Sequence, residues 1–145
     1  MREKEVFSLD AKELIRQALA ARESSWSPYS GFTVGAALLT ESGEIYRGCN
    51  IENAAYTPSN CAERTAFFKA VSEGERAFSA IAIVGGQKGS NLLGYAYPCG
   101  VCRQVMMEFC EPQSFQVIVA VSEDDYIIRS LQQLLPEGFG PENLA

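Results

Sequence analysis

Two short segments contain residue types that could hold a catalytic metal ion. Cys99 and Cys102 form a C-x-x-C pair, the spacing at which two thiolates commonly bind zinc. Cys61 lies far earlier in the chain and could supply a third thiolate, with Glu63 two residues after it. Catalytic zinc sites typically have three protein ligands and one water, whereas structural sites have four protein ligands. The three cysteines therefore favour metal-assisted hydrolysis, with Glu63 as the group that moves protons.

These residues also allow less specific interpretations. The C-x-x-C pair could be two buried cysteines or half of a structural zinc knuckle. Because the chain contains no histidine, a fourth protein ligand would have to be Cys49, Cys110 or a carboxylate. Cys49 and Cys110 are more typical of small buried hydrophobic residues. Without a metal, Glu63 would be an ordinary capping residue that interacts with the backbone of Asn60.

The composition excludes several classes of protein. The absence of histidine excludes Ser-His-Asp and Cys-His nucleophiles and the H-E-x-x-H metalloprotease site. The 18 acidic residues outnumber 12 scattered basic ones, which gives a formal net charge of −6. Binding to a polyanion depends on Lys and Arg, so nucleic acid is a poor candidate partner.

The location of the protein is predicted from its cysteines and its N-terminal residues. Five cysteines, an odd number, and a charged N-terminus without an apolar stretch argue against secretion with a disulfide framework. No apolar run approaches the roughly 20 residues that a membrane span needs. We expect a cytoplasmic protein with reduced thiols and no membrane contact.

The elements that position these residues follow from hydrophobic patterning and turn signals. We predict helices over residues 10–24, 61–73, 99–109 and 130–135, with Asp10 and Asn60 as N-caps of the first two. Strands are predicted over residues 32–40, 45–51, 80–84 and 116–121, with a short edge strand near 126–128 and a loop over 85–98. Buried strands that alternate with helices indicate an α/β sandwich whose mixed sheet is covered on both faces. The hairpin strands should be antiparallel, the strands at 80–84 and 116–121 parallel, and residues 1–145 one domain.

All three candidate ligands lie at or near predicted helix N-termini, where the helix dipole favours thiolates. Arg64 and Gln104 follow the cysteines closely and could donate hydrogen bonds to the sulfurs. Arg64 could equally be a solvated helix residue.

Several motifs together resemble a known family. Cys61-Ala-Glu-Arg64 with Pro98-Cys-Gly-Val-Cys102 looks like the pattern of zinc-dependent nucleoside deaminases. The segments 48–56 (GCNIENAAY), 134–136 (LLP) and 139–141 (FGP) resemble the small homotetrameric cytidine deaminases, and the likeness extends from about residue 11 to residue 141. The resemblance implies a three-layer α-β-α sandwich with a central mixed five-stranded sheet. One departure is Glu137, which bears only on the packing of the tail.

The resemblance also implies an activity and a set of residue roles. The expected reaction is hydrolytic deamination of cytidine and deoxycytidine to uridine and deoxyuridine in pyrimidine salvage, with zinc-bound hydroxide attacking C4. One zinc ion per subunit would be held by Cys61, Cys99 and Cys102, with Glu63 as proton shuttle. Phe32 would contact the pyrimidine, and Asn50 and Glu52 would hold the ribose 3′-hydroxyl. The site of a neighbouring subunit in a homotetramer would be lined by Ala54, Ala55, Tyr56 and Phe139.

Several of these residues, and the function itself, also allow other interpretations. Phe32 could equally belong to the core, and residues 50–53 could be a solvated strand end. A carboxylate at Glu52 would accept a hydroxyl proton but repel a phosphate, which favours free nucleosides. Rival functions are a sibling deaminase acting on blasticidin-like antibiotics, deoxycytidylate or polynucleotide cytosines, and a structural zinc domain that binds a partner.

Overall fold

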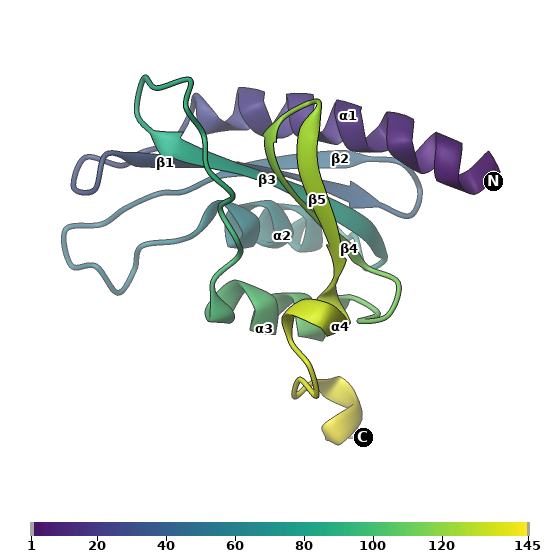
Figure 1. The fold of residues 1–145 in the computed structure, drawn as a ribbon. Coiled ribbons are helices and arrows are strands. Elements are labelled where there is room, and N and C mark those ends of the chain that lie inside the picture. Colours follow the sequence, from purple (N-terminus) through teal and green to yellow (C-terminus); the bar gives the residue numbers. More distant parts are fainter. Residues whose placement is uncertain (1, 145) are drawn as a thin grey trace.

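The structure is a computed structural model that describes the backbone of residues 2–144 and the side chains of residues 11–144. Its helices and strands follow one another along the chain in a largely alternating order (Figure 1). In chain order they are α1 (Arg2–Arg22), β1 (Phe32–Thr40), β2 (Ile45–Cys49), α2 (Ala62–Ser72), β3 (Phe78–Gln87), α3 (Gly100–Phe109), β4 (Gln116–Ser122), β5 (Asp125–Ser130), α4 (Leu131–Leu134) and the 3-10 turn η1 (Pro141–Asn143).

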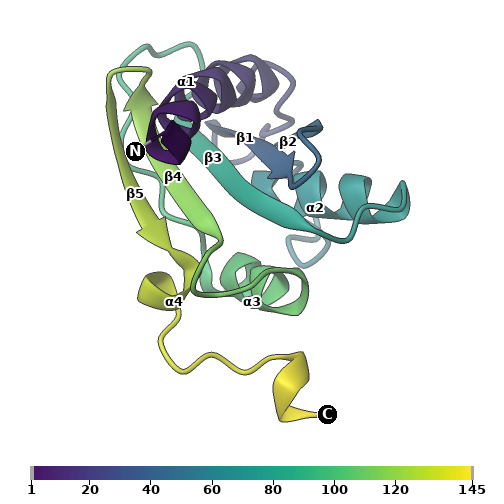
Figure 2. The same ribbon diagram turned by 90° about the vertical axis from the view of Figure 1, so that its right-hand side faces the viewer.

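The strands form one mixed sheet in the order β2-β1-β3-β4-β5. β1 pairs antiparallel with both β2 and β3, and β5 pairs antiparallel with β4. The single parallel pair is β3 with β4, which run in register from Ala80 opposite Gln116 to Ile83 opposite Val119. In the views of Figures 1 and 2, α1 covers one face of the sheet, and α2 and α3 cover the other. The predicted three-layer sandwich with a mixed five-stranded sheet is confirmed.

The central strand β3 shows why both faces must be covered. Its side chains alternate between two hydrophobic clusters, as the two-residue period of a strand requires. Ala80, Ala82 and Val84 pack with α1, whereas Ile81 and Ile83 pack with α2 and α3. Because every one of these side chains is fully buried, the strand reads as a continuous apolar run.

Two glycines bring helix backbones into direct contact with the sheet. A Cβ atom on Gly35 would lie 2.0 Å from the carbonyl oxygen of Ala18 in α1. On the opposite face, a Cβ atom on Gly48 would lie 2.4 Å from the carbonyl oxygen of Ala62 in α2. Gly48 therefore seats the first turn of α2 on the sheet, next to Cys61.

Several predicted boundaries were wrong. α1 begins at Arg2 and not at residue 10, because residues 2–9 contain no proline or glycine and are rich in good helix formers. Asp10 is therefore an interior helix residue and not an N-cap. The N-cap of α2 is Cys61, one residue later than predicted, because the backbone of Asn60 is paired with Ile51.

β3 is longer than predicted, because Gly85 and Gly86 pair with β1 where a loop was expected. None of the helices between residues 2 and 144 combines the length and the hydrophobicity needed to cross a membrane.

Candidate functional site

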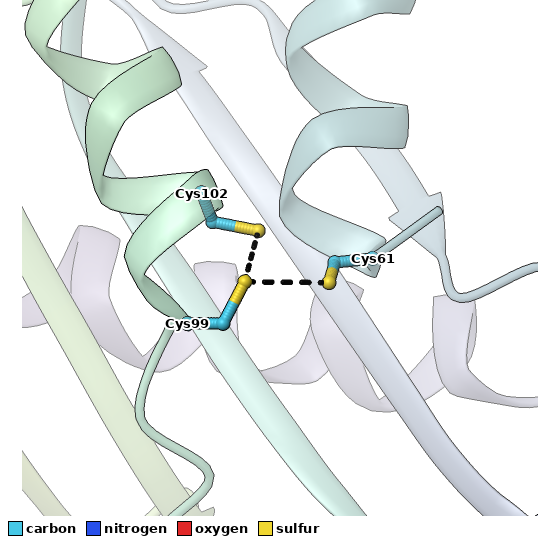
Figure 3. Close-up of side chains that lie close together, drawn as sticks. All are labelled: Cys61, Cys99 and Cys102. Atoms are coloured by element: carbon cyan, nitrogen blue, oxygen red, sulfur yellow. Dashed lines mark hydrogen bonds between the residues drawn. The ribbon is translucent and has the colours of Figure 1, made fainter. Parts of the chain in front are cut away.

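The three candidate cysteine ligands converge between the N-termini of two helices (Figure 3). Cys61 is the N-cap of α2, Cys99 is the N-cap of α3, and Cys102 lies in the first turn of α3. The Sγ atom of Cys99 is 3.7 Å from that of Cys61 and 3.6 Å from that of Cys102. All three sulfurs lie within 4.8 Å of one another.

This donor set fits zinc. Thiolates bound at about 2.3 Å to a tetrahedral zinc ion lie about 3.8 Å apart, close to the separations of the sulfurs. The unpaired N–H groups at the starts of both helices favour the thiolate form. Among the side chains of residues 11–144, no fourth histidine, cysteine, aspartate or glutamate joins the group. Cys49 lies on β2 and Cys110 is the buried C-cap of α3, so neither supplies the fourth ligand of a structural site.

Arg64 supplies positive charge to the sulfurs. Its Nη2 donates to the Sγ of Cys61 at 3.3 Å, which supports the predicted contact and not a solvated residue. Its Nε is buried and has no hydrogen-bond partner within the described part of the chain. The pKa of Cys61 is lowered to about 5 by a hydrogen bond from the Cys102 thiol and by Arg64. The centre therefore holds negative sulfur at neutral pH.

Glu63 is a buried carboxyl group beside these sulfurs. Only 4% of the residue is exposed, and its burial, with the negative charge of Cys61, raises its pKa to about 7. The capping interpretation fails, because the backbone N–H of Asn60 donates to the carbonyl of Ile51. A carboxyl group with a pKa near neutrality can both take up and release a proton at physiological pH.

A cavity of about 410 Å³ opens onto Glu63, Cys61 and Cys99. Its volume is within the range of small-molecule sites. One wall is the ring of Phe32, which is 37% exposed and rests on Gly85, so Phe32 is not a core residue. The cavity is lined by Phe32, Val34, Asn50, Glu52, Ser59, Asn60, Cys61, Glu63, Arg64, Ala96, Tyr97 and Cys99.

Asn50 is held by its amide group at the end of β2. Its Oδ1 accepts from the backbone N–H of Val34 at 2.9 Å and from the Ser25 hydroxyl. Its Nδ2 donates to the carbonyl of Phe32 at 2.8 Å. An amide NH₂ has two donors, so the second remains for a ligand in the cavity.

Glu52 is oriented by the loop that precedes β1. Its Oε1 accepts from the backbone N–H groups of Tyr29 and Ser30 at 3.0 Å and 3.1 Å, and its Oε2 accepts from the Ser30 hydroxyl. These hydrogen bonds, led by that from the Ser30 hydroxyl, lower the pKa of Glu52. A carboxylate has about four acceptor positions, so it can accept a further hydroxyl.

Four of the predicted binding residues lie outside this cavity. Ala54 and Ala55 are exposed, Tyr56 is 74% exposed with a φ of 62°, and Phe139 is 56% exposed in the segment after α4. The structure therefore brings the metal, catalytic, pyrimidine and ribose candidates together, and leaves these four on the surface of the subunit.

The contacts of the two residues after Cys102 differ from those predicted from the sequence. Gln104 was expected to donate to the sulfurs, but its Nε2 donates to the carbonyl of Phe139 at 2.9 Å. Two residues along a helix correspond to a rotation of about 200°, which turns Gln104 away from Cys102. The sequence analysis missed Arg103, whose guanidinium binds the carbonyls of Pro98 and Leu134. No local sequence signal marks such a contact.

Comparison with known proteins gives a consistent result. Residues 9–119 match the family described as "Cytidine and deoxycytidylate deaminase zinc-binding region". A cytidine deaminase of Sporosarcina psychrophila is 49% identical over 94% of this chain and 96% of the relative, and one of Halalkalibacterium halodurans is 46% identical over 94% and 98%. The crystal structure of cytidine deaminase from Burkholderia pseudomallei superposes with a TM-score of 0.79 at 46% identity, covering 88% of this chain and 97% of that one.

Proposed function

Because this chain belongs to the cytidine and deoxycytidylate deaminase family, we propose that it hydrolyses cytidine and deoxycytidine to uridine and deoxyuridine. The observation that carries the proposal is a buried carboxyl group, Glu63, beside three sulfurs at zinc-ligand spacing. Glu63, Cys61 and Cys99 line a cavity large enough for a nucleoside. The family relation supports one zinc ion per subunit and a reaction of pyrimidine salvage.

Cys61, Cys99 and Cys102 would hold the zinc ion. When bound, zinc supplies the Lewis acidity that lowers the pKa of water from 15.7 towards about 7. Glu63 takes a proton from the attacking water and gives it to N3 of the pyrimidine, which makes C4 electrophilic, and the water oxygen bonds to C4. Glu63 then takes the remaining proton of this new C4 hydroxyl and delivers it to the exocyclic amine, so that the C4–N bond breaks and ammonia leaves. A single carboxyl group suffices, because it alternates between base and acid.

The other cavity residues would bind and orient the nucleoside. Phe32 offers a ring face to the pyrimidine, and the free N–H of Asn50 and the carboxylate of Glu52 would hold the ribose 3′-hydroxyl. Glu52 remains ionised near neutrality because its pKa is lowered, so it would repel a phosphate at that end of the cavity. This charge and the acidic surface favour nucleosides over nucleotides and over nucleic acid.

We also propose a homotetramer in which neighbouring subunits complete each site. The supporting observation is that Ala54, Ala55, Tyr56 and Phe139 are exposed and lie outside the cavity of their own subunit. Light scattering measures the assembly directly. Mixed assemblies of Glu63→Gln and Phe139→Ala subunits should be more active than the average of the two parents, because each variant supplies what the other lacks. Activity equal to that average would remove the shared site.

The test of the function is a substrate panel on zinc-loaded protein. Cytidine and deoxycytidine should give the uracil nucleoside and one equivalent of ammonia, and deoxycytidylate, blasticidin-like antibiotics and single-stranded DNA should react far more slowly. No turnover of either nucleoside would overturn the proposal. A cytoplasmic location stays a prediction, which fractionation of cells can test.

A further inference from the structure

We propose that Arg103 is a positioning residue that fixes the C-terminal arm against the metal-binding loop. The C-terminal arm is residues 135–144, which follow α4. The metal-binding loop is residues 95–99, which lead into α3 and end on Cys99. The inference rests on the proposed function, because that function gives Phe139 of the arm a place at the substrate.

Arg103 contacts both segments with one guanidinium group. Its Nε donates to the carbonyl of Pro98 at 2.7 Å, one residue before the ligand Cys99. Its Nη1 donates to the carbonyl of Leu134 at 2.6 Å, at the last residue of α4. A guanidinium presents its donors in a rigid planar fork, so the two carbonyls are held at fixed relative positions. The metal-binding loop and the start of the arm are therefore coupled through one side chain.

Arg103 forms no ion pair in the described structure. The ion pairs found among residues 11–144 involve Lys12 and Arg16, and none includes Arg103. Its donors point to backbone carbonyls, as expected of a residue that fixes chain segments.

The arm has few other hydrogen bonds to the rest of the described chain. Figures 1 and 2 show it leaving α4 and extending away from the sheet. Within the described residues, one hydrogen bond joins residues 136–144 to the rest of the chain, from Gln104 to the carbonyl of Phe139. A cavity of about 440 Å³ is lined by residues of the arm and of α3, and beside it Gly140 is buried against Met107. The hydrogen bonds from Arg103 and Gln104, together with the burial of Gly140 against Met107, therefore set where Phe139 lies.

The test compares Arg103→Gln with a matched control, Arg76→Gln. Arg76 also donates to two backbone carbonyls, those of Val71 and Glu75, but at the far end of α2. For Arg103→Gln we expect kcat/KM for cytidine to fall by about 10- to 100-fold, the range that a small misplacement at a site costs, with a raised KM. Arg103→Lys should recover part of the loss, because an ammonium can reach one of the two carbonyls. Arg76→Gln should have wild-type kinetics.

A double-mutant cycle with Phe139→Ala separates positioning from a general structural role. If Arg103 acts through the arm, removing Phe139 costs much less in the Arg103→Gln background than in the wild type. Additive losses, or kinetics of Arg103→Gln equal to those of Arg76→Gln, would overturn the inference. If Arg103→Gln does not fold, the same cycle with Arg103→Lys, which keeps the positive charge, gives the answer with the same criteria.

Hydrogen–deuterium exchange supplies a readout that does not need activity. Amides of the C-terminal arm should exchange faster in Arg103→Gln than in the wild type and in Arg76→Gln, with zinc content unchanged. Unchanged exchange in the arm would contradict the coupling, even if the protein proved not to be a deaminase. An inactive wild type with an arm loosened by Arg103→Gln would instead overturn only the proposed function.

Discussion

Replacing Gly48 by alanine tests how the sheet positions the catalytic residues. The new Cβ would lie 2.4 Å from the carbonyl oxygen of Ala62 and 2.5 Å from the backbone nitrogen of Ala66, where ordinary contact begins at 3.4 Å. The first turn of α2 must therefore move by about 1 Å, at an overpacking cost of about 1–3 kcal/mol. Because Cys61 and Glu63 lie on that turn, we expect kcat/KM to fall by about 100-fold.

Two control variants separate this displacement from a loss of stability. Gly35→Ala creates an even closer contact, 2.0 Å from the carbonyl oxygen of Ala18, but on the α1 face, which carries no proposed site residue. Gly94→Ala meets nothing within 4 Å.

The assay is cytidine turnover per folded, zinc-loaded molecule at a temperature well below each variant's Tm. Gly35→Ala should lower the Tm and keep most of kcat/KM, and Gly94→Ala should change neither. Wild-type kcat/KM in folded Gly48→Ala, or an equal loss in Gly35→Ala, would refute the reasoning.

Three further substitutions test individual roles. Glu63→Gln should keep stoichiometric zinc while kcat falls by about 100- to 10,000-fold, the usual contribution of a positioned proton shuttle, and an active variant would contradict that role. Cys99→Ala should lose zinc by elemental analysis, since two thiolates remain, whereas full metal content would disprove the ligand assignment. Glu52→Gln should raise KM for cytidine and leave zinc unchanged. Because folding lowers the pKa of Glu52, its stabilising effect is present above its ordinary value of 4.5 and is lost as pH falls through the folded value. The Tm difference between Glu52→Gln and wild type should therefore shrink in acid, and a constant difference would argue against the bonds to Ser30.

Much of the architecture could be predicted from local pattern. The apolar run of β3 and the hairpin β1–β2 follow from hydrophobicity and turn residues, which act over a few positions. The ends of helices and strands could not be predicted where contacts with distant parts of the chain decide them. Gly85 and Gly86 look like a loop in isolation, yet they complete the ladder with β1. Asp10 looks like a cap, yet the preceding residues continue the helix.

The candidate site also contains features that could be predicted from the sequence and features that could not. Cys61, Cys99, Cys102 and Glu63 were predictable, because metal chemistry restricts residue types and spacing. The contacts of Arg103 and Gln104 were not predictable. Their acceptors are backbone carbonyls, which every residue has, so the residue type of the partner gives no signal. The depth at which Glu63 is buried was also inaccessible, because it depends on Gly48 allowing α2 to approach the sheet.

The central claim is a metal centre of three sulfurs with one position left for a substrate or water. X-ray absorption at the zinc edge of the purified protein tests it most directly. We expect one zinc ion per chain with three sulfur neighbours at about 2.3 Å and one oxygen or nitrogen neighbour. Four sulfur neighbours, or the absence of stoichiometric zinc, would contradict the account.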